Sequence, residues 1–153
     1  MQLHLFHSDC TFSGMKLSER AWQAWSLLAF AAGNRQIITY EILGKLTGMA
    51  AAGLGSVLEQ IQSYCLVNNL PPLSALVVNK STGLPSQGFT ATTNVPLAFV
   101  QIFEFDWLSI TCPTPTQLEE ATRARPSNGV DADGRQILAD SPQSVDASLP
   151  SAG

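Results

Sequence analysis

Apolar residues recur at intervals of three and four in three separate stretches of the chain, which is the spacing of one helix face. The first stretch follows Ser18, a residue suited to an N-cap, and ends near Gly33. Its apolar positions are Ala21, Trp22, Trp25, Leu28, Ala29 and Ala32. We therefore predict a helix over 18–33, with both tryptophans as core anchors. A role for Trp22 or Trp25 in stacking on a base or a partner would require one of them to be exposed.

The next two stretches are joined by a short connection of small residues. The second helix is expected to be capped by Thr39, to run to Thr47 and to end at Gly48, with an inner face of Tyr40, Leu43 and Leu46. The third is expected over 54–67, with inward positions Leu54, Val57, Leu58, Ile61, Tyr64 and Cys65. Two helices joined in this way are typical of a helix-turn-helix, although ordinary three-helix cores share the pattern.

A strand and a turn follow the third helix. Asn68 and Asn69 close that helix, and the apolar run from Leu76 to Val78 predicts a buried strand. Residues 79–83 predict a hairpin tip, and residues 84–89 the return. The predicted fold is α+β and mainly helical: a winged helix-turn-helix with a short β-hairpin wing.

The stretch 94–107 is apolar on all sides. It contains Val95, Leu97, Phe99, Val100, Ile102, Phe103, Phe105 and Trp107. Such a run is too apolar for an exposed helix, and we expect it to cover the core between the first helix and the wing. The apolar surplus also fits a dimer or partner interface at Phe103, Phe105 and Trp107, and the sequence leaves this alternative open.

Composition divides the chain at residue 112. Residues 1–112 form the predicted winged-helix core with an N-terminal arm. Residues 113–153 are rich in Pro, Ser, Ala and Asp and hold almost no large apolar side chains, so we predict a disordered tail. The tail carries a net charge of −3, which leaves −1 of the formal −4 to residues 1–112.

This charge balance restricts the functions that the chain can have. A nearly neutral core lacks the strong basic field of an autonomous nucleic-acid binder. Its acidic residues are also too scattered for a protein that mimics DNA. No basic segment precedes an apolar one at the N-terminus, and no apolar run approaches the ~20 residues that span a bilayer. With three cysteines outside any CxxC motif, we expect a reduced, cytoplasmic protein without membrane contact.

Candidate catalytic and metal-binding residues gather only near the N-terminus. His4, His7, Asp9 and Cys10 could form a metal site, but they lack the usual ligand spacing, and solvated polar residues are the default interpretation. No nucleophile elbow, phosphate-binding loop or pair of flanked carboxylates occurs elsewhere. We predict no catalytic centre, no metal and no cofactor.

Several motifs together carry a resemblance to a known family. They are Ile38-Thr39-Tyr40 to Leu43, the small-residue turn at 50–53, Asn68-Asn69-Leu70-Pro71 with the strand after it, and Gly88-Phe89. Over about fifty residues, this order resembles the C-terminal winged-helix domain of DNA alkyltransferases and alkyltransferase-like proteins.

The resemblance implies a scaffold without the family's chemistry. Tyr40 matches the tyrosine that helps to rotate the target nucleotide out of the duplex in that family. The family's arginine in the turn is absent from residues 51–54, and its Pro-Cys-His-Arg tetrad is absent from residues 73–78. Because no cysteine lies between Cys65 and Cys112, the resemblance implies no alkyl transfer.

Two functions of different classes follow from these observations. The first is a non-catalytic winged-helix protein that binds double-stranded DNA. Its contact residues would be Tyr40, Lys45, Ser56, Glu59, Gln60, Ser63 and Lys80. The second is a protein-interaction module, an adaptor or an inhibitor of a nucleic-acid complex such as one of phage or host defence, with a homodimer as a further alternative.

Overall fold

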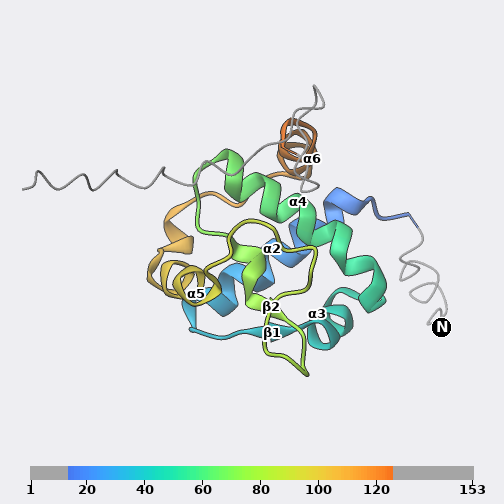
Figure 1. Cartoon of the computed structure of the whole chain (residues 1–153). Coiled ribbons are helices and arrows are strands. Elements are labelled where there is room, and N and C mark those ends of the chain that lie inside the picture. Colours follow the sequence, from blue (N-terminus) through green and yellow to red (C-terminus); the bar gives the residue numbers. More distant parts are fainter. Residues whose placement is uncertain (1–13, 126–153) are drawn as a thin grey trace, which may run out of the picture.

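The computed structural model of the chain describes residues 14–125, and its architecture is mainly helical with a small two-stranded parallel sheet (Figure 1). The α-helices are α2 (Leu17–Gly33), α3 (Tyr40–Thr47), α4 (Leu54–Val67), α5 (Val95–Glu104) and α6 (Pro115–Ala124). Three short 3-10 helices are η1 (Ala51–Gly53), η2 (Leu73–Leu76) and η3 (Trp107–Ser109), and the strands are β1 (Ile38–Thr39) and β2 (Val77–Val78).

Helix α2 is the central element of the core and contacts α3, α4, α5 and α6. Its start differs from the sequence prediction, because the helix begins at Leu17 and the Glu19 carboxylate accepts the N–H of Lys16 at 2.8 Å. Ser18, the predicted N-cap, lies inside the helix. It is buried and donates its hydroxyl to the Glu119 carboxylate on α6 at 2.9 Å.

Helices α3 and α4 have the predicted bounds. The Thr39 hydroxyl accepts the N–H of Ile42 at 3.3 Å, and Gly48 ends α3 with a φ of 69°, a left-handed conformation that glycine adopts without strain. Gly44 lets α3 approach the turn, because a Cβ atom at this position would lie 2.7 Å from the Met49 carbonyl oxygen. The inner face of α3 differs from the prediction at one position, because Leu46 is 56% exposed.

The sheet is parallel. The predicted β-hairpin, whose two strands would be antiparallel, is therefore wrong. Strand β2 pairs with β1, with Ile38 opposite Val77 and Thr39 opposite Val78. Residues 84–89 form no strand. This segment contains Pro85 and Gly88, two residue types that disfavour strands. The chain turns back through the bond from the Asn79 N–H to the Leu84 carbonyl at 2.8 Å, so a short turn stands where a wing was expected.

The apolar stretch 94–107 covers the core only in part, because Leu97 and Val100 are each 49% exposed. It forms α5, whose first turn is capped by the Asn94 side chain accepting the N–H of Leu97 at 3.1 Å. Ala98 and Ile102 face the core. Trp107 follows in η3 and is buried as well, with its indole N–H donating to the Ile102 carbonyl at 2.8 Å.

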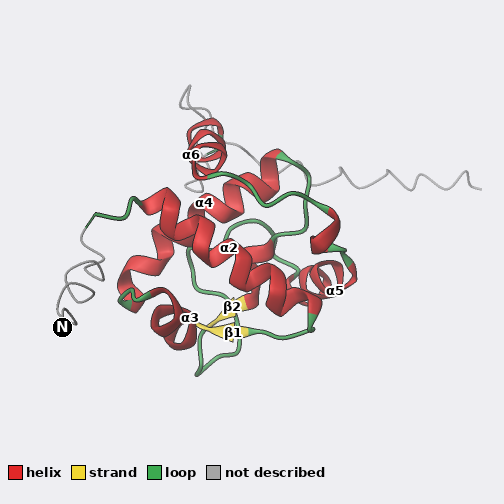
Figure 2. Ribbon diagram, turned by 180° about the vertical axis from the view of Figure 1, so that it is seen from behind, coloured by secondary structure: helices red, strands yellow, loops and turns green. Residues whose placement is uncertain are grey.

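The first residues of the predicted disordered tail are instead part of the folded core. Helix α6 begins with reciprocal bonds: the Thr114 hydroxyl accepts the N–H of Gln117 at 3.2 Å, and the Gln117 side chain accepts the N–H of Thr114 at 2.9 Å. Leu118 and Ala121 are buried, and α6 packs against both α2 and α4 (Figure 2). The predicted boundary at residue 112 is wrong. It was based on the composition of residues 113–153 as a whole, which does not indicate one short capped helix within them. Residues 126–153 lie outside the described range.

Candidate nucleic-acid interface

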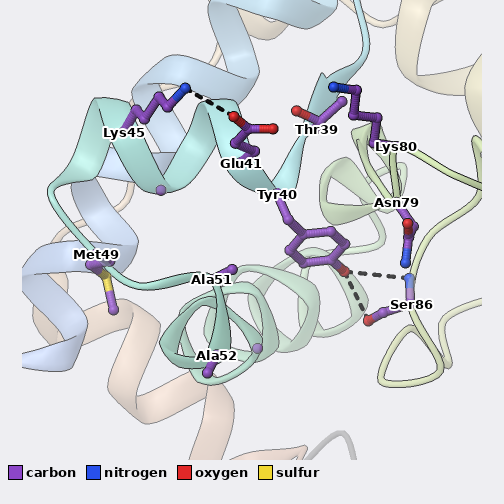
Figure 3. Close-up of a pocket in the computed structure, with 12 residues that line it drawn as sticks. Thr39, Tyr40, Glu41, Lys45, Met49, Ala51, Ala52, Asn79, Lys80 and Ser86 are labelled. Carbon is purple, nitrogen blue, oxygen red and sulfur yellow. Dashed lines mark hydrogen bonds and ion pairs between the residues drawn. The ribbon is translucent and has the colours of Figure 1, made fainter.

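A groove of about 680 Å³ lies where α3, η1 and the turn after β2 meet (Figure 3). Its floor consists of small and apolar residues, and its rim is polar. The lining residues are Thr39, Tyr40, Glu41, Gly44, Lys45, Met49, Ala51, Ala52, Gly55, Asn79, Lys80 and Ser86. The volume is in the range of small-ligand sites. We call this cavity the Tyr40 groove.

Tyr40 joins the two walls of the groove. As the first residue of α3, it follows directly after β1. Its hydroxyl donates to the Ser86 hydroxyl at 2.8 Å and accepts the Ser86 N–H at 3.3 Å. These two bonds connect residues 46 positions apart and hold the phenol ring between the start of α4 and the 79–86 segment (Figure 3).

The turn after β2 presents Lys80 at the rim. The Asn79 side-chain oxygen accepts the Ser81 N–H at 3.1 Å and the Ser81 hydroxyl at 2.8 Å, and the Gly83 N–H donates to the Asn79 carbonyl at 2.7 Å. Gly83 has a φ of 66°, which completes the turn. The turn is thus held by its own hydrogen bonds, while the Lys80 side chain stays exposed.

The charges at the groove are two lysines and one glutamate. Lys45 forms an ion pair of 2.9 Å with Glu41 one helical turn away, and both side chains are largely exposed. The hydrogen bond from Lys45, followed by the positive charges of Lys45 and Lys80, lowers the pKa of Glu41. Glu41 is therefore ionised at neutral pH, and the groove carries a small positive charge.

The start of α4 forms the other side of the groove. Ala51, Ala52 and Gly55 line it, Ser56 follows them, and all four residues are small and exposed. Neither η1 nor α4 has a side chain that caps its first N–H groups. The N–H groups of Gly53 and Leu54 donate to the Ala50 and Ala51 carbonyls, so the small side chains alone make this surface smooth and open to a close approach.

A second, much smaller cavity of about 30 Å³ lies behind Tyr40, between α4 and the 86–89 segment. Its lining includes Ser74, whose hydroxyl is buried and has no hydrogen-bond partner among the described residues. Gln62, also on the wall, bonds reciprocally to Thr90, donating to its hydroxyl at 3.1 Å and accepting its N–H at 3.2 Å. The space accommodates one water molecule beside Ser74.

The structure brings together three of the seven predicted DNA contacts. Tyr40, Lys45 and Lys80 line the Tyr40 groove. Ser56 is exposed on the nearby first turn of α4, and Glu59 is half-buried at the small cavity. Asn79 was predicted only as part of the 79–83 turn, and Ser86 was not predicted as a site residue, because neither belongs to a periodic pattern.

Gln60 and Ser63 are corrections to the predicted contact set. They are 7% and 0% exposed, so neither side chain can contact a ligand at the surface. The prediction treated the polar face of α4 as open, whereas α4 packs against α6 as well as α2. Helix α6 comes from the segment that the sequence analysis assigned to the tail.

The predicted partner residues are also largely covered. Trp107 is 4% exposed and packs edge-on against Trp25, with ring centroids 5.7 Å apart, which corrects its assignment to an interface. Phe103 and Phe105 are half-buried against the core. Conversely, Trp22 was expected in the core and is 47% exposed.

Other candidate chemistry is sparse. Cys65 is fully buried, as expected, and burial raises its pKa to about 12, which makes the thiol unreactive at neutral pH. Residues 14–125 contain no cluster of His, Cys, Asp and Glu suited to a metal ion, while His4, His7, Asp9 and Cys10 lie outside the described residues. No helix in the described range is long and apolar enough to cross a membrane.

Comparison of the chain with known protein families, with curated proteins and with solved structures returned no match. The resemblance to alkyltransferase-like domains therefore depends on the motifs quoted above.

Proposed function

We propose that the protein is a non-catalytic DNA-binding protein that contacts duplex DNA through the Tyr40 groove and the exposed start of α4. The observation that carries the proposal is the groove itself. It combines a fixed aromatic ring, a floor of small residues and two lysines at the rim, next to α3 and α4, two helices joined by a short connection. The finer description as a winged helix belongs to this proposal, with the 79–84 turn in place of a wing.

The charges support weak binding. Residues 14–125 contain seven basic and seven acidic residues, so the described part of the chain has no net field to concentrate DNA. If Lys45 and Lys80 each neutralise one phosphate, log K should fall with log salt at a slope of about −1.8. Affinity should then drop about twelvefold between 50 and 200 mM salt, far less than for a strongly basic domain.

The groove also suggests which DNA binds best. Its volume suits one nucleotide that has left the base stack, and Tyr40 occupies the position of the nucleotide-rotating tyrosine in the family that the chain resembles. Extruding a base costs least where it is already unpaired. A duplex with a single bulged base should therefore bind more tightly than a fully paired duplex of the same length.

Fluorescence polarisation with labelled duplexes tests the proposal. The full chain is titrated into paired and bulged duplexes at 50 and 200 mM salt. Lys80→Gln should reduce the salt slope by about 0.9, whereas Lys16→Gln, an exposed lysine just before α2, should leave it unchanged. No binding at 50 mM salt, or equal effects of the two substitutions, would refute the proposal.

A second candidate function is supported by a different surface. Several large apolar side chains are exposed although the domain is neutral, among them Phe30 at 69% and Leu108 at 87%. Such a surface is typical of a protein-interaction module. Alanine at Phe30 and Leu108 should then abolish capture of a protein partner while DNA binding remains unchanged.

A further inference from the structure

Among the described residues, the outer face of α2 is an apolar stripe that no other helix covers. Figure 2 shows α2 crossing the front of the molecule with no other helix over it. Trp22 and Phe30 are 47% and 69% exposed, and Ser26, midway between them, is exposed as well. Trp25 and Leu28 on the opposite face are buried, so the helix has apolar residues on both sides.

The neighbouring elements extend this stripe. Leu46 of α3 joins Trp22, Gln23, Ser26 and Leu27 around a hollow of about 250 Å³. Cys112 lies beside this face, since burial raises the pKa of its thiol while Ser26 and Trp22 both lower it by a smaller amount. On η3, which contacts α2, Leu108 is 87% exposed. We call the exposed faces of Trp22, Ser26, Phe30, Leu46 and Leu108 the α2 face.

We propose that the α2 face binds a second copy of this chain, with the two α2 helices antiparallel about a two-fold axis at Ser26. The spacing carries the argument. In such a pair, residue 22 of one copy lies opposite residue 30 of the other, so that Trp22 meets Phe30 twice. The small serine on the axis allows close approach of the helices.

The charge pattern fits the same occupant. A residue on a two-fold axis lies next to the same residue of the other copy. A charged residue on the axis would therefore face an identical charge and be repelled. Helix α2 contains no charged residue between Arg20 and the helix end at Gly33. In the described range, α3, α4 and α6 each contain at least one charged residue, and α5 is uncharged up to its last residue, Glu104. The uncharged stretch extends for more than one helical turn on each side of Ser26.

The size of the face predicts a weak dimer. A helix of 17 residues is about 25 Å long, and a strip about 10 Å wide gives about 250 Å² per copy. Stable interfaces bury about 800 Å² per partner, so α2 alone is insufficient, and Leu46 and Leu108 must contribute. We expect a Kd on the order of micromolar or weaker.

Sedimentation velocity of the full chain, from about 1 μM to about 1 mM, tests the proposal over the range expected for such an interface. The average mass should rise with concentration. Ser26→Arg, which places two positive charges on the axis, should raise Kd at least tenfold. The matched control is Leu97→Arg, at an exposed apolar position of α5, which should leave Kd unchanged. A monomer at all concentrations, or equal effects of both substitutions, would overturn the proposal.

Cross-linking tests the axis independently. In a background with Cys10 and Cys112 replaced by serine, Ser26→Cys is oxidised with copper phenanthroline, which joins two thiols as a disulfide with loss of their protons and two electrons. Helix axes 8–10 Å apart place facing Cα atoms about 4–5 Å apart, within disulfide reach. A covalent dimer is expected for Ser26→Cys and not for Ser56→Cys on α4. Equal cross-linking of both variants would refute the antiparallel arrangement.

Discussion

Replacing Gly44 by alanine tests the close contact that shapes the floor of the Tyr40 groove. In an open helix, glycine to alanine adds about 1 kcal/mol of stability. At residue 44, the new Cβ atom would lie 2.7 Å from the Met49 carbonyl oxygen, closer than any normal contact. Because a backbone atom cannot move away as a side chain can, the overpacking cost of about 1–3 kcal/mol should exceed the gain.

The matched control is Gly55→Ala on α4. No atom lies within 4 Å of a Cβ atom at that position, so the helix-propensity gain should appear in full. Urea unfolding should therefore place Gly44→Ala below the wild type and Gly55→Ala above it. The two variants should then differ by the overpacking cost of about 1–3 kcal/mol, which with a slope of about 2 kcal/mol per molar urea moves the midpoints about 0.5–1.5 M apart. A Gly44→Ala protein as stable as the wild type would refute the close approach of α3 to the turn.

Three further predictions concern the core. Leu118→Ala should destabilise the protein by about 2–5 kcal/mol in urea unfolding, because the side chain is fully buried; a change below about 0.5 kcal/mol would mean that α6 is not part of the core. Trp107→Phe should cost about 1–3 kcal/mol by leaving the Ile102 carbonyl without its donor, and thermal unfolding that matches the wild type would contradict this. Alkylation at pH 8 followed by mass spectrometry should modify Cys112 and spare Cys65 until denaturant is added.

The helices that the sequence predicted well are those with local signals. Thr39 and Gly48 bracket α3, and the apolar spacing from Leu54 onward gave the bounds of α4. Such caps and periodicities act within a few residues, so they can be read without knowledge of the fold.

Apart from the start of α2, the failures depend on contacts between distant segments. The pairing of β1 with β2 joins residues 38 and 77, and two short strands cannot be assigned partners from their own residues. Helix α6 has only two buried apolar positions, Leu118 and Ala121, and its composition resembles the rest of the tail. Once α6 is in place, the burial of Gln60 and Ser63 follows.

The candidate site was predicted in part for the same reason. Tyr40, Lys45 and Lys80 were found from motif and charge, whereas the bond of Tyr40 to Ser86 spans 46 residues and leaves no periodic trace. Trp22 was predicted in the core but is exposed. The apolar spacing identifies one face of the helix, but it does not indicate which part of that face a neighbouring element covers.

The most direct test of the central claim is an NMR titration of the ¹⁵N-labelled full chain with a duplex that contains one bulged base, at 50 mM salt. If the Tyr40 groove binds DNA, amide shifts should concentrate at Tyr40, Ala51, Gly55, Lys80 and Ser86, around the groove. Shifts that are absent from these residues, or that are confined to the α2 face, would contradict it.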